Sequence, residues 1–311
     1  MYNRKKFLKL SGGAAFGLFA APSLLASCNS ANNKETQPGT DTTGKAAANP
    51  DAGLAGISAL GLQLYSLRDD LPKDPKGILK QVASFGYKEV ESFEGAQGMF
   101  WGMGHTGFKQ YMDELGMKIV SSHCDYKKDF EKKAAEAAEI GMSYLICPWV
   151  GPQKKLDDYK KLAEEFNHAG EICKKNGIKF GYHNHNYSFT LQDGQFPQDI
   201  FMQNTDKDLV DFEMDIYWVV TAGQDPIEWL KKYSGRFKLC HIKDRKKGVA
   251  PTPGEPNLSV IVGTGSIDFK KILAEARTEG MAHYIVEQEA YEKTPIECVK
   301  EDATYLNNLT F

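Results

Sequence analysis

The 311-residue sequence lacks the cysteine patterns that mark two common kinds of stabilised domain. It has six cysteines, and no two of them form the CxxC pair typical of thiolate zinc sites. Apart from Cys28 near the start, their number is odd and their spacing is unpaired, so we expect no disulfide framework. We interpret the remaining five as buried free thiols: Cys124, Cys147, Cys173, Cys240 and Cys298.

Two further absences narrow the class of protein. The chain has 38 basic and 41 acidic residues, a net charge of -3, and no basic stripe, which argues against a nucleic-acid partner. A doubly wound dinucleotide-binding sheet would need a glycine-rich turn after its first strand. The residues at that point, Tyr65-Ser66-Leu67-Arg68, do not form one.

The first 28 residues have the pattern of a targeting segment. Basic residues Arg4-Lys5-Lys6 precede a mostly apolar stretch, residues 7–26, that glycine and proline interrupt and that is short for a membrane span. The tetrapeptide Leu25-Ala26-Ser27-Cys28 resembles a lipobox, in which Cys28 is lipidated and becomes the mature N-terminus. These features predict that residues 1–28 form a lipoprotein signal segment. A short transmembrane anchor is the alternative.

A polar stretch separates this segment from the folded part of the chain. Residues 29–56 are rich in Asn, Lys, Thr, Gly and Ala without apolar periodicity, which predicts a disordered tether. Residues 57–311 then form the folded domain. We expect an exported lipoprotein, anchored to a membrane by its lipid and lying on the periplasmic side.

Short apolar runs alternate with helical patterns from Ala59 onward. Leu60–Tyr65 is the first predicted strand, and Asp74 with Pro75 predicts the start of the first helix. Eight such repeats predict a single closed parallel (β/α)8 barrel. In this fold, polar residues at the carboxyl ends of the strands converge on one mouth. The residues that this rule brings together are Glu91, His123, His183, His185, Asp215, His241 and Glu287.

Histidines and carboxylates in such a cluster are typical ligands of a divalent metal. Glu213 shares the facing of Asp215 and is a rival ligand. Asp215 could instead cap a helix beginning near Tyr217. His183 and His241 could be buried histidines with purely structural hydrogen bonds. An aromatic, glycine-rich loop at residues 99–104 suggests a lid or a contact with a second subunit in a homo-oligomer.

Six segments together resemble the xylose isomerase-like TIM-barrel superfamily, in its sugar phosphate isomerase/epimerase group. The resemblance spans residues 59–308. Each segment alone is weak, and their order and spacing carry the likeness: residues 63–68, Tyr182-His183-Asn184-His185, Asp215-Ile216-Tyr217-Trp218, His241-Ile242-Lys243-Asp244, residues 263–268 and Ile285-Val286-Glu287.

The resemblance implies the roles of individual residues. A divalent metal (Mn, Zn, Co, Fe or Mg) would be held by His183, Asp215, His241 and Glu287. Epimerases of the group carry glutamate at the position of His183, so this chain departs from them there. Catalytic roles are implied for Glu287, His183 and His185, and substrate contacts for His123, Trp218, Lys243 and Glu91.

The resemblance also implies a reaction. The expected activity is that of a sugar isomerase or epimerase that removes a proton next to a carbonyl. Histidine at position 183 favours a second reading, a lyase or dehydratase that acts on keto-sugars or 3-keto-glycosides. A non-catalytic carbohydrate-binding lipoprotein is the alternative from another class.

Overall fold

The computed structural model describes residues 55–250 and 257–311. The predicted signal segment, with Cys28, and most of the tether lie outside the described residues. No helix among the described residues has the length and apolar character needed to cross a membrane.

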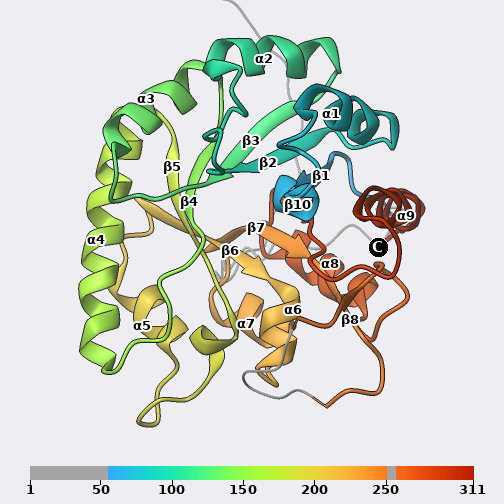
Figure 1. Cartoon of the computed structure of the whole chain (residues 1–311). Coiled ribbons are helices and arrows are strands. Elements are labelled where there is room, and N and C mark those ends of the chain that lie inside the picture. The colour runs from blue at the N-terminus through green and yellow to red at the C-terminus, as the bar shows by residue number, and fades with distance from the viewer. Residues whose placement is uncertain (1–54, 251–256) are drawn as a thin grey trace, which may run out of the picture. The chain divides into compact units, whose positions relative to one another are not determined.

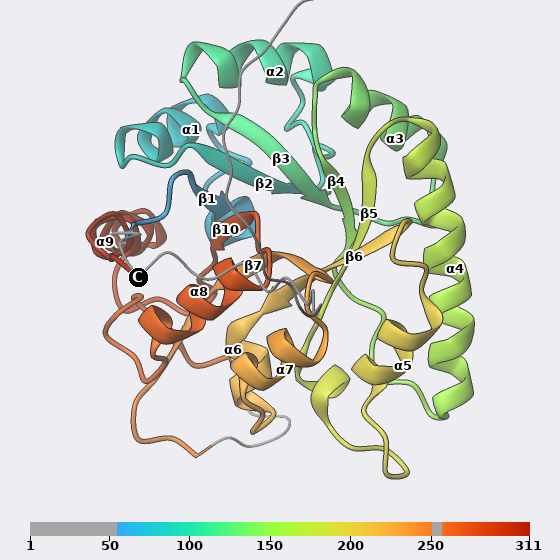
Figure 2. The same cartoon turned by 180° about the vertical axis from the view of Figure 1, so that it is seen from behind.

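The described chain forms one closed barrel of eight parallel strands, in the order β1-β10-β7-β6-β5-β4-β3-β2. Helices ring the strands on the outside, as Figures 1 and 2 show from opposite sides. This arrangement confirms the predicted (β/α)8 barrel. The strands are β1 (Leu60–Gln63), β2 (Glu89–Phe93), β3 (Lys118–His123), β4 (Tyr144–Cys147), β5 (Lys179–His183), β6 (Val210–Asp215), β7 (Phe237–Ile242) and β10 (His283–Val286).

The helices alternate with the strands along the chain, and the first begins where the sequence predicted. Asp74 caps the first of them, because its side chain accepts a hydrogen bond from the Gly77 N–H at 2.9 Å. The helices are α1 (Pro75–Ser84), α2 (Gly104–Glu114), α3 (Phe130–Glu139), α4 (Leu156–Lys175), α5 (Pro197–Asn204), α6 (Ile216–Thr221), α7 (Pro226–Lys232), α8 (Phe269–Thr278) and α9 (Pro295–Asn307), with short 3-10 turns η1 (Leu64–Leu67) and η2 (Asn186–Phe189).

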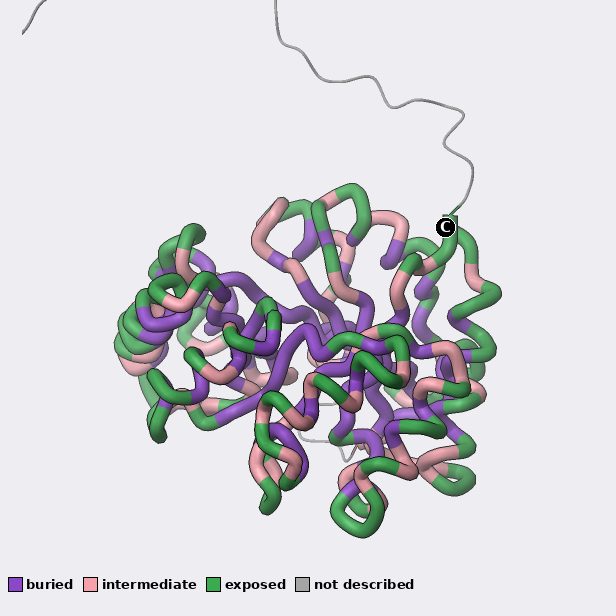
Figure 3. The backbone as a smooth tube through the Cα atoms, turned by 90° about the horizontal axis from the view of Figure 1, so that it is seen from above, coloured by how far each residue is buried: buried purple, intermediate pink, exposed green. Residues whose placement is uncertain are grey.

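A small apolar cluster fills the barrel interior beneath the site. Tyr144, Ile146, Leu239 and Ile285 meet although they come from β4, β7 and β10, strands that are not all neighbours. A Cβ atom on Gly181 would lie 3.0 Å from Ile146 Cγ1, so glycine leaves room for that side chain. The remaining apolar residues pack between the strands and the helices, and Figure 3 shows buried residues concentrated at the barrel's centre.

The interior cluster sets the facing of the site residues. Side chains two apart on a strand point to the same side. His241 is therefore placed directly above Leu239, and Glu287 above Ile285. His183 stands in the same way above Gly181. The apolar interior thus forms the floor of the polar mouth.

Three features differ from the expectations. The first strand ends at Gln63, whose side chain accepts a hydrogen bond from the Tyr65 N–H and begins η1. The final helix α9 completes the eighth repeat at a position that the sequence pattern did not specify, and Thr294 and Glu297 form a capping box at its start. Trp101 is 3% exposed and donates a hydrogen bond to Ser92 Oγ, so this side chain packs in the core and is not part of an open lid.

The loop after β7 carries a two-stranded antiparallel sheet, β8 (Asp244–Arg245) and β9 (Ser259–Val260). Asp244 fixes this loop, because its carboxylate accepts hydrogen bonds from the N–H groups of Gly263 and Gly265. Asp302 on α9 holds the adjoining segment by accepting a bond from the Val262 N–H at 2.7 Å. Burial, with a contribution from Asp244, raises the pKa of Asp302 to about 8.

Replacing Asp302 with Asn is expected to stabilise the fold at high pH. Between pH 4 and 8 the folded state retains a proton on Asp302 that the unfolded chain releases, so the free energy of unfolding falls as pH rises. The Asn variant has no carboxyl group to titrate at this position, so its free energy of unfolding does not fall in this way. The difference in free energy of unfolding between the variant and the wild type should therefore grow by up to about 1.4 kcal/mol per pH unit. Urea unfolding at pH 5 and pH 8 measures the effect, with exposed Asp113→Asn as control. An equal response of both variants to pH would contradict the assignment.

Candidate metal centre and active site

Four predicted metal ligands meet at the carboxyl ends of the barrel strands. His183 ends β5, Asp215 ends β6, His241 lies near the end of β7, and Glu287 directly follows β10. All four side chains are buried, with at most 5% exposure. Residues up to 104 positions apart in the chain, from 183 to 287, therefore meet at the strand ends, as the barrel fold predicted.

The atoms that face one another have spacings suited to an ion between them. His183 Nε2 lies 3.8 Å and His241 Nδ1 lies 4.0 Å from Asp215 Oδ2. His241 Nδ1 is 3.3 Å from Glu287 Oε2. Ligands bound to one zinc ion at about 2.0–2.2 Å lie about 3–4 Å apart, which matches these distances. Asp215 Oδ2 is buried without a hydrogen-bond partner among the described residues, so it is an oxygen free to bind a cation.

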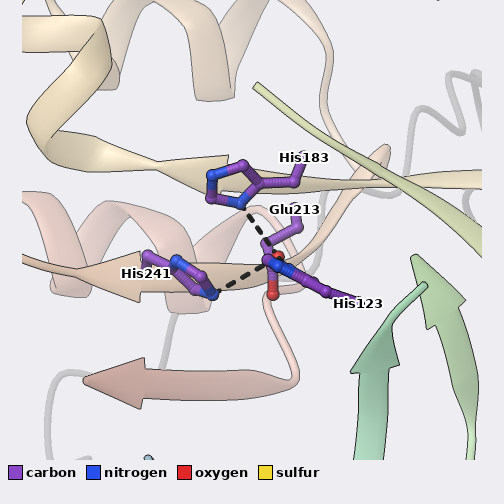
Figure 4. Close-up of side chains that lie close together, drawn as sticks. All are labelled: His123, His183, Glu213 and His241. Carbon is purple, nitrogen blue, oxygen red and sulfur yellow. Dashed lines mark hydrogen bonds and ion pairs between the residues drawn. The ribbon is translucent and has the colours of Figure 1, made fainter. Parts of the chain in front are cut away.

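The same two histidines use their other ring nitrogens to contact a deeper pair of carboxylates. His183 Nδ1 lies 3.0 Å from Glu213 Oε2, and His241 Nε2 lies 2.7 Å from Glu91 Oε1. Figure 4 shows the imidazoles converging on Glu213. A carboxylate behind a ligating histidine fixes its tautomer and its orientation. Each imidazole is therefore oriented so that its other ring nitrogen faces the remaining predicted ligands: His183 Nε2 faces Asp215, and His241 Nδ1 faces Asp215 and Glu287.

His123 joins the two supporting carboxylates. Its Nε2 lies 2.8 Å from Glu213 Oε2 and 3.1 Å from Glu91 Oε1. Burial lowers the pKa of His123, but Glu91 and Glu213 outweigh it and raise the pKa to about 10. A positive imidazolium thus compensates two buried acids. The result is a continuous buried chain of contacts: His241, Glu91, His123, Glu213, His183.

Glu213 was the rival ligand, and the structure distinguishes it from Asp215 by depth. His123, His183, Glu213 and His241 do offer four donor atoms within 4.8 Å of one another. Glu213, however, contacts two of these imidazoles at 2.8 and 3.0 Å, the lengths of ordinary hydrogen bonds. These contacts favour a supporting role for Glu213, and Asp215 stays the predicted ligand.

Asp215 serves two purposes that the sequence presented as alternatives. Its Oδ1 accepts a hydrogen bond from the Trp218 N–H at 2.9 Å and so caps α6. Its Oδ2 faces His183, His241 and Lys243. The helix-cap interpretation is confirmed, and it leaves the second oxygen available for a metal.

Lys243 and Glu91 are placed differently from the substrate contacts expected of them. Lys243 is 0% exposed, and its ammonium lies 2.6 Å from Glu289, 3.2 Å from Glu287 and 3.7 Å from Asp215. Burial would raise the pKa of Glu287, but Lys243 and then His241 hold it well below its usual range. Glu91 is also fully buried and receives hydrogen bonds from Gln63 and Ser121. Both side chains act on other protein groups.

A cavity of about 950 Å³ opens from the cluster into the barrel mouth. Four of the predicted site residues line it: His123, His183, His185 and Glu287. Burial lowers the pKa of His185 to about 3, so its imidazole is neutral at neutral pH. Its Nδ1 has no hydrogen-bond partner among the described residues. Trp218 packs behind His185, with ring centroids 5.6 Å apart, and is not among the cavity-lining residues.

Comparison with known proteins places the chain in a family. The family model for the xylose isomerase-like TIM barrel matches residues 79–309, and the chain belongs to this family. An inosose dehydratase of Clostridium tetani is 30% identical over 272 residues, which cover 81% of this chain and 87% of that protein. The sequence resemblance to the superfamily is thereby confirmed.

Solved structures agree with the fold. A sugar phosphate isomerase/epimerase from Parabacteroides distasonis is 34% identical, with a TM-score of 0.68, and the match covers 82% of this chain and 94% of that one. The IolI protein, crystallised with a zinc atom, shares the fold at 16% identity and a TM-score of 0.65, over 79% of this chain and 95% of that one. The buried histidines and carboxylates of this chain suit a divalent metal, whose identity the donor set does not determine.

We expect the protein to bind about one divalent ion per chain, through His183, Asp215, His241 and Glu287. Asp215→Ala and His241→Ala should each lose the metal, because each removes a donor from a buried set. Elemental analysis after dialysis measures the metal content. His283→Ala is the matched control, since His283 bonds to Glu89 at the opposite end of the barrel. Full metal retention by both site variants would rule out this ligand set.

Glu213→Gln is expected to weaken metal binding about 10- to 100-fold, because it removes the charge that supports His183. Competition with a chelator measures the affinity. Glu94→Gln is the control, because Glu94 bonds to Lys133 and to the Asp125 N–H. Unchanged affinity in Glu213→Gln would contradict the supporting role. A loss as complete as that of Asp215→Ala would make Glu213 a ligand.

Proposed function

We propose that the protein is a divalent-metal-dependent carbon–oxygen lyase that acts on a keto-sugar or a related polyhydroxylated ketone. One observation carries the proposal. Of the four carboxylates packed against the histidines, namely Glu91, Glu213, Asp215 and Glu287, only Glu287 lines the cavity. Epimerisation by proton removal and return needs two bases on opposite faces of the sugar. Elimination needs a single base and a proton donor.

The residues around the cavity could supply the base and the proton donor that elimination needs. A metal held by His183, Asp215, His241 and Glu287 would supply Lewis acidity toward a carbonyl and its neighbouring hydroxyl. Glu287 is ionised and faces the cavity, which suits removal of the proton from the carbon beside the carbonyl. His185 faces the same cavity as a neutral imidazole, which can hydrogen-bond to the departing oxygen. The apolar floor beneath the cluster excludes water from below.

The proposed reaction balances without an oxidant or a reductant. The C–H bond beside the carbonyl breaks, and its electron pair becomes part of a new carbon–carbon double bond. The C–O bond at the next carbon breaks, and its oxygen takes a proton to leave as water or an alcohol. The Clostridium tetani relative, named an inosose dehydratase, supports a reaction of this class.

An isomerase or epimerase is the second candidate, and the name of the Parabacteroides distasonis structure favours it. NMR in deuterated water, with the metal-loaded protein and a panel of keto-sugars and keto-glycosides, separates the candidates. An unsaturated ketone supports the lyase. An epimer or isomer with deuterium at the reacting carbon supports the second candidate, and binding without exchange or product supports a non-catalytic carbohydrate-binding protein.

Glu287→Gln should lower kcat by about a hundredfold or more, the usual contribution of a general base. The amide keeps an oxygen of similar size, so appreciable metal should remain bound. Glu289→Gln is the matched control, because Glu289 also lines the cavity and contacts Lys243, and it should lose less than tenfold. Turnover and metal content are measured on the same samples. Elimination at the wild-type rate by metal-loaded Glu287→Gln would exclude the base assignment.

We also propose that the chain is exported and anchored through a lipid on Cys28. The lipobox-like tetrapeptide ending at Cys28 supports this proposal. Detergent phase partitioning of the full chain tests it. The wild type should enter the detergent phase, and Cys28→Ser should remain unlipidated. Recovery of the wild type in the aqueous phase would exclude the anchor.

A further inference from the structure

The cavity extends well beyond the space that one reacting sugar ring would occupy. Its volume of about 950 Å³ lies at the upper end of the roughly 300–1,000 Å³ typical of sites for drug-sized ligands. One end is lined by His183 and Glu287 at the cluster. Other parts of its wall come from the end of β2 and from the loops that follow β3 and β4, including Phe93, Tyr126 and Trp149.

Trp149 is the conspicuous residue of this outer part. Its indole lines the cavity and is 53% exposed, although burial of so large an apolar ring would be favourable. It packs edge-to-face with His185 at 4.4 Å and with Tyr187 at 4.9 Å, measured between ring centroids. Trp149 therefore extends the aromatic wall of the site outward, and part of its surface is left for a ligand.

The loop that presents Trp149 is fixed by hydrogen bonds. The Val150 N–H donates to the Tyr187 hydroxyl at 3.3 Å, and the Gln153 side chain donates to the Val150 carbonyl at 2.8 Å. The Gln153 N–H donates to the Tyr159 hydroxyl at 2.8 Å. Binding to a loop held in place costs little conformational entropy. The platform is thus formed before a ligand arrives.

Polar groups surround this platform. Asp125, Lys127, Lys128 and Gln153 line the same cavity as Trp149. An aromatic face combined with charged and amide side chains matches a sugar ring, which has an apolar C–H face and a rim of hydroxyl groups. A plain aryl group would use the indole but has no hydroxyl groups to hydrogen-bond with these polar side chains.

We propose that the outer part of the cavity is a subsite for a second sugar ring, stacked on Trp149 and joined to the ring that reacts at the metal cluster. The location of the reacting ring rests on the proposed function. The His185 ring lies 5.0 Å from His183 and 4.4 Å from Trp149, between centroids, so it stands at the boundary between the two parts. The bond joining the two rings would cross this boundary.

The subsite specifies which C–O bond the lyase breaks. Proton loss from the carbon beside the carbonyl forms the carbon–carbon double bond, and the C–O bond to the second ring breaks. The departing oxygen takes a proton and leaves as a hydroxyl group of the released sugar. The substrate class is therefore a keto-disaccharide, and the products are an unsaturated keto-sugar and a free sugar.

Equilibrium binding tests the subsite without relying on turnover. Calorimetric titrations of the metal-loaded protein compare cellobiose and maltose with methyl β-glucoside, which lacks a second ring, and with phenyl β-glucoside, which carries an aryl group. At least one disaccharide should bind about tenfold or more tightly than methyl β-glucoside in the wild type, and Trp149→Ala should abolish this advantage. Trp149→Phe should restore part of it. Leu191→Ala, at a side chain that is 59% exposed and is not among the cavity-lining residues, should leave it intact.

Three results would overturn the subsite. The first is equal or undetectable binding of all four sugars by the wild type. The second is tighter binding of a disaccharide that persists in Trp149→Ala, and the third is a Trp149-dependent increase in affinity for phenyl β-glucoside alone. Circular dichroism and metal content show whether Trp149→Ala has folded. If it has not, the affinities of Trp149→Phe for the same sugars test the subsite instead. Turnover is scored separately, as the ratio of kcat/KM for a keto-disaccharide to that for its methyl keto-glycoside. Loss of the binding advantage in Trp149→Ala without any turnover by the wild type would support the subsite and refute the lyase.

Discussion

The two-sided use of the imidazoles of His183 and His241 is the interaction on which the site depends. Each ring contacts a supporting carboxylate with one nitrogen and faces the ligand carboxylates with the other. Buried charges are costly unless they are paired and hydrogen-bonded. Here His123 brings positive charge to Glu213 and Glu91, and Lys243 brings it to Glu287 and Asp215. Four acids can therefore lie in the barrel mouth without open contact with bulk water.

The four carboxylates lie at different depths below the barrel mouth, and this depth determines whether each one supports a histidine, faces the other predicted ligands or reaches the cavity. Glu213 and Asp215 lie on the same side of β6, one strand repeat apart, and each keeps a buried carboxylate oxygen without a hydrogen-bond partner among the described residues. The free oxygen of Asp215 is the one that lies 3.8 Å from His183 Nε2 and 4.0 Å from His241 Nδ1. Glu91 is deeper still and is saturated by donors from β1, β3 and β7. Glu287 alone combines contact with a site histidine and access to the cavity. Of the four acids, Glu287 is thus the one base that a ligand in the cavity could reach.

The sequence was sufficient to predict the barrel and the position of its site. Eight strand–helix repeats imply closure, and closure brings strand ends such as Asp215 and His241 together. The sequence could not separate Glu213 from Asp215, because an alternating pattern gives the facing of a residue but not its cross-barrel partners. For the same reason the sequence could not show that Lys243 lies among Asp215, Glu287 and Glu289, since these acids come from other parts of the chain. The helix at 295–307 does have a start signal in the sequence, the capping box of Thr294 and Glu297.

The two oxygens of Asp215 connect the predicted metal site to a tryptophan whose fluorescence can be measured. One oxygen holds the first turn of α6 through the Trp218 N–H, while the other faces the ligand set. The Trp218 ring in turn lies over the Lys243 ammonium, 5.0 Å away, and beside His185. A cation drawn to Asp215 would redistribute charge around this indole. Trp218 is therefore placed as an intrinsic fluorophore whose emission reports the filling of the centre.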